Sequence, residues 1–151
     1  MKISDLLSPS DVWVNVAASN KQLVLHDLAS KAATSLGLDV DRIAPYLRKR
    51  EEFGSTGIGR GAAIPHALLP DLQRPFGLMA KLKQPIEFDA IDSQAVDLVF
   101  LLLLPERTDN GQLSALALVA RLLRRIDVLD RLRSARDTAG IWSVMAAASR
   151  T

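Results

Sequence analysis

The chain has 151 residues, of which 48% are hydrophobic and 24% charged, a balance typical of a globular domain rather than of a disordered or fibrous protein. It contains no cysteine, which excludes disulfides, thiolate metal sites and cysteine catalysis. With 19 Lys and Arg against 17 Asp and Glu, the net charge of +2 is too small to indicate nucleic-acid binding. We therefore expect a single domain over residues 1–151.

The N-terminus and the apolar runs give no indication of a membrane protein. Met1–Asp5 carries charges where a signal peptide needs an apolar stretch. The longest strongly apolar run, Leu98–Leu104, is too short to span a bilayer. We expect a cytoplasmic protein without membrane insertion.

Strand and helix patterns alternate along the chain, which is typical of an α/β domain. Val12–Val16 alternates in polarity and predicts a strand. Ser19, with Gln22 three residues later, predicts a capping box at the start of a helix that Gly37 would end. The apolar face of this helix is predicted to consist of Leu25, Leu28, Ala29, Ala32 and Leu36.

A shorter helix is predicted over Ile43–Arg50, with Pro45 in its first turn and Asp39 or Asp41 as its cap. The next stretch is dense in glycine and proline, and only Ala62–Ile64 within it reads as a short strand. The breakers of this stretch are Gly54, Gly57, Gly59, Gly61, Pro65, Pro70 and Pro75.

The middle of the chain predicts a strand over Gly77–Leu82 and a turn-rich connection over Pro85–Asp92. Val96–Leu104 is a continuous apolar run, which favours a strand buried on both faces at the centre of the sheet.

Three helices are predicted to complete the chain, after turn or cap residues at 109–111. The first, Gln112–Arg125, is apolar on nearly all sides as far as Arg121, so we expect it to be mostly buried. It would pack against the sheet or against another subunit of a homo-oligomer. The other two cover Val128–Ser134 and Thr138–Ser149, where arginines alternate with aspartates as on a solvated surface.

The two histidines stand in different contexts. His26 shares a helix face with Gln22 and Ser30, so it is expected to point to solvent. His66 follows Pro65 at the end of a glycine-rich segment. A neutral imidazole can attack phosphorus through its lone pair.

A phosphoryl group on His66 would need donors and cations around its oxygens. Glycines let backbone N–H groups approach an anion, and Ser55 and Thr56 add hydroxyl groups. Cations close in sequence are Arg48, Lys49, Arg50 and Arg60. On the residues alone, a glycine-rich segment that ends in Pro-His is more often a plain turn than a phosphoryl site, and both interpretations stay open.

Other kinds of site fit the segment poorly. The glycines are not followed by the Lys and Ser or Thr of a Walker A motif. A proline-rich loop stands where a dinucleotide fingerprint would open a helix. Two histidines without cysteine argue against a metal site, and no cofactor is expected.

Three ordered segments resemble the EIIA domains of the fructose/mannitol type of the bacterial phosphotransferase system: Gly54–Gly59 through Ala63–His66, Pro85–Asp92 and Val96–Glu106. The likeness covers nearly the whole chain and is greatest to the stand-alone nitrogen-regulatory branch of this family. It implies a compact α/β domain with a mixed sheet flanked by helices on both sides.

The resemblance also implies a function. His66 would accept a phosphoryl group from a phosphohistidine on a small HPr-like carrier, and Arg50 would contact the phosphoryl oxygens. Ser55, Thr56, Arg60 and Gln112 are further candidates for stabilising the group. In the regulatory branch the implied partners are proteins such as potassium transporters and sensor kinases, bound according to the phosphorylation state.

Two positions depart from the family pattern. The family usually has a second histidine where this chain has Gln112, which can donate a hydrogen bond but cannot take a charge. Arg60 replaces a small polar residue and adds a permanent positive charge. These departures leave open a binding module that is phosphorylated slowly or not at all. A separate alternative is a sugar-transport EIIA that acts with a membrane permease, which the absence of a fused transporter segment from this sequence does not favour.

Overall fold

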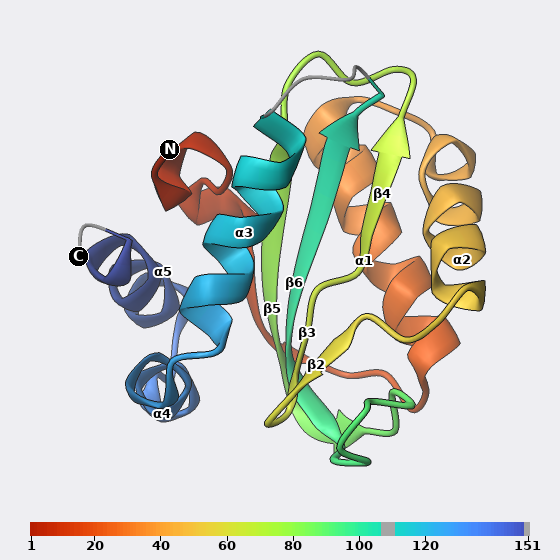
Figure 1. The fold of residues 1–151 in the computed structure, drawn as a ribbon. Coiled ribbons are helices and arrows are strands. Elements are labelled where there is room, and N and C mark those ends of the chain that lie inside the picture. The colour runs from red at the N-terminus through yellow and green to blue at the C-terminus, as the bar shows by residue number, and fades with distance from the viewer. Residues whose placement is uncertain (107–110, 150–151) are drawn as a thin grey trace.

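A computed structural model of the chain describes residues 1–106 and 111–149. Its centre is a mixed β-sheet with α-helices packed on both faces (Figure 1). One face carries α1 (Lys21–Leu36) and α2 (Ala44–Glu52). The other carries α3 (Gly111–Leu123), α4 (Ile126–Ser134) and α5 (Thr138–Ala148). The α/β fold with a mixed sheet between two helical layers is confirmed.

Over the described residues the sheet has six strands in the order β1-β5-β6-β3-β2, with β4 paired to β6 as well. The strands are β1 (Val12–Val16), β2 (Gly57–Gly59), β3 (Ala62–Ala63), β4 (His66–Leu69), β5 (Phe76–Ile86) and β6 (Val96–Pro105). The β5–β6 and β2–β3 pairs are antiparallel, whereas β1 joins β5, and β3 and β4 join β6, in parallel. β6 is therefore central, as its apolar run predicts.

The side chains of β6 divide the interior into two cores. Val99, Leu101 and Leu103 belong to the core under α1 and α2. The alternate residues, Leu98, Phe100, Leu102 and Leu104, belong to the core under α3, α4 and α5. This alternation is the period of two that a strand imposes, and it explains why β6 is apolar at every position from Leu98 to Leu104.

The glycine- and proline-rich stretch over residues 54–75 contains three short strands. The sequence predicted only β3; β2 and β4 were not predicted. β3 pairs with the first half of β6, and β4 pairs with the second half, where His66 lies opposite Leu102. Ala67 and Leu69 of β4 enter the core under α1 and α2. By alternation, His66 stays out of this core.

The helix caps differ from the prediction. α1 begins after Asn20, whose side chain accepts a hydrogen bond from the Leu23 amide at 2.9 Å, so the predicted cap at Ser19 is wrong. Gly37 ends this helix with φ of 70°, as predicted. Asp39 caps the 3-10 turn Val40–Arg42 rather than α2. α2 has no side-chain cap of its own.

Two further elements differ in extent or burial. β5 continues to Ile86, so Pro85 and Ile86 belong to a strand and not to the connection after it. The pairing register shifts between Lys81 and Ile86, and a proline fits such an irregularity because it lacks the N–H of a regular ladder. α3 buries only one face within this chain, and Leu113 is 73% exposed, so the sheet alone does not bury most of the helix. Burial of its other face against another subunit stays a prediction.

Two further expectations concern the turn before α3 and the absence of a membrane span. The predicted cap residues Asp109 and Asn110 lie outside the described residues. Across 1–106 and 111–149, none of the helices combines the length and apolar character that a membrane crossing requires.

The observed cap gives a stability prediction. Asn20→Ala removes the acceptor of the Leu23 amide and should lower the free energy of unfolding by about 1 kcal/mol. Ser19→Ala is the matched control and should change it by less than about 0.5 kcal/mol. Urea denaturation of both variants measures the difference, and equal losses would contradict the assignment of Asn20 as the cap.

Candidate functional site

His66, the first residue of β4, has a defined tautomer. Its Nδ1 lies 2.8 Å from the carbonyl oxygen of Ile64. A carbonyl oxygen can only accept, so Nδ1 carries the proton and donates it to Ile64. Nε2 therefore holds the lone pair of the ring, which is the atom that a nucleophilic imidazole uses.

Arg50, near the end of α2, faces this lone pair. Its Nε donates to His66 Nε2 at 3.4 Å, and its Nη1 donates to the Gly54 carbonyl at 2.9 Å. The first contact is long for a hydrogen bond and weak, whereas the second has good geometry. The backbone of Gly54 thus holds the guanidinium in place while leaving it only loosely bound to the imidazole.

The surroundings of His66 lower the pKa of its imidazole below the ordinary value of about 6.5. Burial is the largest cause, because it disfavours the charged ring, and the positive charge of Arg50 acts in the same direction. The hydrogen bond to Ile64 and the negative charge of Glu51 raise the pKa but do not outweigh these effects. His66 is therefore neutral near pH 7 and keeps its lone pair available.

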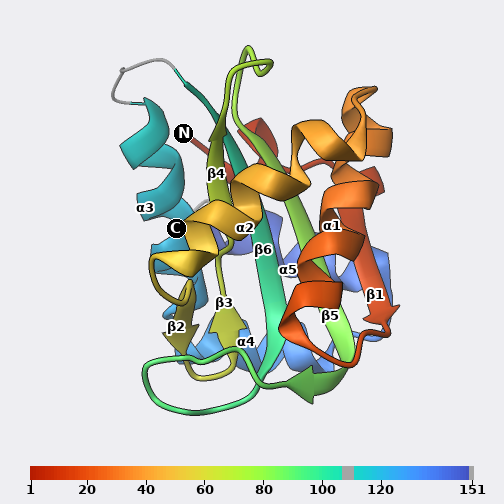
Figure 2. The same ribbon diagram turned by 90° about the vertical axis from the view of Figure 1, so that its right-hand side faces the viewer.

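His66 opens into a pocket of about 580 Å³ between α2, β4 and the start of α3. In Figure 2, α2 crosses the face of the sheet beside β4, and α3 lies beyond that edge of the sheet. The polar lining consists of Lys49, Arg50, His66, Glu106 and Gln112. The apolar lining, here named the apolar rim, consists of Tyr46, Phe53, Ala67, Leu68, Leu104, Leu113 and Leu116.

Gln112 lies in this pocket with His66, as the sequence led us to expect. It stands in the first turn of α3, and its side-chain amide donates to the carbonyl of Pro105 at the end of β6. An amide at this position can also donate to an oxygen in the pocket, and the first turn of a helix favours an anion.

Ser55 and Thr56 are not among the residues that line the pocket. The Ser55 hydroxyl donates to the Phe88 carbonyl at 2.6 Å. The Thr56 hydroxyl and amide both donate to the Glu51 carboxylate, at 2.7 and 2.9 Å, and Thr56 is only 5% exposed. These hydrogen bonds hold the loop together and direct neither hydroxyl at the pocket of His66. A role for Ser55 and Thr56 around a phosphoryl group stays a prediction that this arrangement does not favour.

Arg60 does not reach the pocket either. It occupies the turn between β2 and β3 with φ of 57°, where its amide donates to Asp92 at 2.8 Å and its carbonyl accepts from Arg133 at 2.6 Å. β3 and His66 pair with positions four residues apart on β6, Leu98 and Leu102, a separation of about 13 Å at about 3.3 Å per residue. This placement does not favour the expectation that Arg60 supplies a cation beside His66.

The sequence did not predict the apolar rim. It also did not predict that the Glu51 carboxylate holds the loop before β2 by accepting hydrogen bonds from Thr56. One signal was present, since Tyr46, Arg50 and Phe53 are spaced as neighbours on one face of a helix. Phe53 is 84% exposed, which is unusual for a phenylalanine and marks this face. His26 is exposed on α1, as expected, and does not line this pocket.

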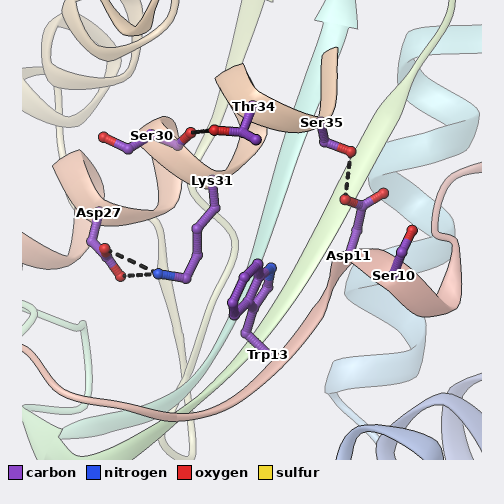
Figure 3. A pocket seen from close by; sticks show the side chains of 8 residues that line it. All are labelled: Ser10, Asp11, Trp13, Asp27, Ser30, Lys31, Thr34 and Ser35. Carbon is purple, nitrogen blue, oxygen red and sulfur yellow. Dashed lines mark hydrogen bonds and ion pairs between the residues drawn. The ribbon is translucent and has the colours of Figure 1, made fainter. Parts of the chain in front are cut away.

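A second cavity, of about 390 Å³, lies against the outer edge of β1 (Figure 3). Its charged groups are paired with one another or with hydroxyls. Lys31 bonds Asp27 at 2.9 Å and lies 4.6 Å from the centre of the Trp13 ring, and Asp11 accepts from Ser35 at 2.6 Å. These side chains leave no nucleophile comparable with the neutral His66.

The chain is similar to known proteins over almost its whole length. Residues 5–148 match the family model described as "Phosphoenolpyruvate-dependent sugar phosphotransferase system, EIIA 2". The chain is 44% identical over 146 residues to a nitrogen regulatory protein of Bradyrhizobium diazoefficiens, covering 97% of this chain and 95% of the relative. It is 36% identical to a nitrogen regulatory protein of Escherichia coli, covering 96% and 90%.

Solved structures show the same fold. Nitrogen regulatory protein IIA-Ntr from Neisseria meningitidis superposes with a TM-score of 0.89 at 24% identity, covering 95% of this chain and 98% of that one. IIA mannitol from Escherichia coli gives a TM-score of 0.77 at 14% identity, covering 93% and 99%.

The lowered pKa of His66 predicts a pH dependence of stability. Below about pH 6.5 the unfolded chain protonates this imidazole before the folded protein does, so the free energy of unfolding should fall as the pH drops toward the folded pKa. His66→Gln lacks this titration and should lose less stability between about pH 7.5 and about pH 5. Urea denaturation at both pH values tests this.

The titration itself can be read by NMR in the His26→Ala variant, whose remaining imidazole belongs to His66. Its midpoint should lie below about 6.5. A midpoint above that value, or equal pH dependence of stability in wild type and His66→Gln, would contradict the prediction.

Proposed function

The chain belongs to the EIIA 2 family of the phosphoenolpyruvate-dependent sugar phosphotransferase system, and on that premise we propose that it is a regulatory member that accepts a phosphoryl group on Nε2 of His66. One observation carries the proposal. The bond from Nδ1 to Ile64 leaves a neutral Nε2 lone pair that faces Arg50 at the edge of an open pocket. The proposed donor is a phosphohistidine on an HPr-like carrier.

The proposed step is an in-line displacement at phosphorus. Nε2 of His66 forms the new N–P bond while the N–P bond of the carrier breaks and its imidazole leaves with the electron pair. Positive charge develops on the His66 ring, and the Ile64 carbonyl stabilises it through the Nδ1 proton. The weak contact from Arg50 to Nε2 is exchanged for a charge-assisted bond to a phosphoryl oxygen.

The pocket suits a protein donor better than a free metabolite. Phe53 and Leu113 of the apolar rim are 84% and 73% exposed, so they offer apolar area that a docking protein would cover. Lys49 and Arg50 lie on the same side of the pocket and would attract the phosphoryl group as the carrier approaches.

A regulatory role is favoured by the relatives. Proteins named nitrogen regulatory protein align at 44% and 36% identity over almost their whole length. A fructose-specific EIIABC component of Bacillus subtilis aligns at 29%, and the match covers only 23% of that larger protein. We accordingly propose that the protein acts in the cytoplasm. Its proposed partners are proteins, such as potassium transporters or sensor kinases, that distinguish its phosphorylated from its unphosphorylated form.

A second candidate function is a binding module that phosphorylation reaches slowly or not at all. Gln112 favours it, because this residue lines the pocket where the family usually has a second histidine. Gln112 can supply a hydrogen bond but no positive charge, and a neutral donor is weaker than a charged one. The rate of phosphorylation of the wild-type protein separates the two candidates.

The phosphoryl acceptor is tested by incubating the protein with phosphoenolpyruvate, enzyme I and the HPr-like carrier, and measuring its intact mass. The wild type and His26→Ala should gain one phosphoryl group, because His26 is exposed on α1 and lines no part of the pocket. His66→Ala should gain none. Labelling of His66→Ala would refute the assignment of the acceptor, and an unlabelled wild type would support the binding module.

The structure makes opposite predictions for two arginines. Arg50→Ala should slow transfer by about 10- to 100-fold, because a charge-assisted contact is worth roughly 1.5–3 kcal/mol. Arg60→Asn should leave the rate unchanged, since Arg60 lies away from the pocket and Asn tolerates its positive φ. Rapid-quench kinetics with the phosphorylated carrier measure both, and a slow Arg60→Asn variant would show that its side chain reaches the site.

A further inference from the structure

A buried ion pair stands directly behind the site and takes no part in the proposed chemistry. Lys21, the first residue of α1, lies 2.8 Å from the carboxylate of Glu51, and the two side chains are only 9% and 7% exposed. Burying two charges is costly unless each is fully partnered, so such a pair is weak evidence of a purely stabilising role. Glu51 follows Arg50 in α2, which places it next to the residue that faces His66.

The Glu51 carboxylate is linked to His66 through the backbone. It accepts hydrogen bonds from the amide and hydroxyl of Thr56, at 2.9 and 2.7 Å. The carbonyl of Thr56 accepts from the Ile64 amide at 3.0 Å. The carbonyl of Ile64 in turn accepts the Nδ1 proton of His66 at 2.8 Å. The carbonyl that sets the tautomer of His66 is therefore held in place by Glu51 through Thr56.

Glu51 is also linked to the other nitrogen of His66, through its neighbour Arg50. Arg50 Nε points at His66 Nε2, and Arg50 Nη1 donates to the carbonyl of Gly54, within the turn that connects Glu51 to Thr56. The contacts of both imidazole nitrogen atoms therefore depend on the position of residues 50–56. We name these residues, Arg50, Glu51, Thr56, Ile64 and His66, the positioning ring.

Lys21 anchors the positioning ring to the rest of the fold. Its Nζ donates to the Phe88 carbonyl at 3.3 Å and lies 4.8 Å from the centre of the Phe88 ring. The same carbonyl accepts from the Ser55 hydroxyl at 2.6 Å. Lys21 therefore joins α1, the end of α2 and the segment after β5 at one point.

We propose that Glu51, held by Lys21, is a positioning residue that fixes the Nδ1–H tautomer of His66 and the place of Arg50 beside Nε2. It touches neither the phosphoryl group nor the carrier, and it acts through Thr56, Ile64 and Arg50. The effect on transfer rests on the function proposed above, whereas the effect on the tautomer does not.

The test is the double variant Lys21→Met/Glu51→Gln, which keeps side-chain volume and leaves neither charge buried alone. Gln keeps one oxygen that can accept from the Thr56 amide, but its amide nitrogen can only donate to the Thr56 hydroxyl. The charge-assisted bond from that hydroxyl to Glu51 is therefore replaced by a weaker neutral bond of opposite direction. Imidazole 15N NMR should show a reduced share of the Nδ1–H tautomer. The kcat for transfer should fall by roughly 10- to 100-fold while the KM for the carrier stays constant, because the apolar rim is untouched.

The matched control is Lys31→Met/Asp27→Asn, which removes another ion pair of α1, at 2.9 Å, without touching the positioning ring. It should leave tautomer and rate as in the wild type. Urea denaturation accompanies both variants. A Lys21→Met/Glu51→Gln protein that folds with wild-type tautomer and rate would overturn the proposal, as would an equal loss of rate in the control.

Thr56→Val and Thr56→Ser supply a milder pair should the double variant fail to fold. Val removes only the hydroxyl bond to Glu51 and should shift the tautomer and the rate in the same direction, and Ser should restore both. An unchanged tautomer in Thr56→Val would count against the proposal. If the wild type is not phosphorylated at all, the proposed function fails, and the NMR comparison still decides whether Glu51 positions His66.

Discussion

The double-sided burial of β6 is the constraint on which the rest of the structure depends. Each face of this strand forms the floor of a separate hydrophobic core, so it must lie inside the sheet with helices on both sides. Its second half pairs with β4, which fixes the position of His66 opposite Leu102. At the end of β6, the carbonyl of Pro105 accepts a hydrogen bond from the side-chain amide of Gln112. This bond holds the start of α3 beside the pocket of His66.

Arg50 meets two requirements that usually conflict. A nucleophilic imidazole must be neutral before the reaction, yet a phosphoryl group on it needs positive charge nearby afterwards. Arg50 lowers the pKa of His66 in the unmodified protein, and the same guanidinium is placed to bind an anion on Nε2. One fixed charge therefore favours the reactive form and the proposed product, without a second histidine among the residues that line the pocket.

The sequence predicts elements whose signal is local and misses those that depend on distant contacts. The apolar run of β6 and the glycine that ends α1 require nothing beyond their neighbours, and both are confirmed. The pairing of Lys21 with Glu51 joins different helices and leaves no pattern in the sequence. Arg60 is near His66 in sequence but not in space, because extended chain separates them.

The short length of β4 has a consequence for how the protein behaves at high concentration. Among the described residues β4 pairs only with β6, so its other side is an edge, and exposed edges invite pairing with other chains. This edge has four residues and is bounded by Pro65 and Pro70, which lack the N–H that an incoming strand would need. The His66 side chain can thus stay accessible from the pocket while the edge of β4 resists pairing with strands of other chains.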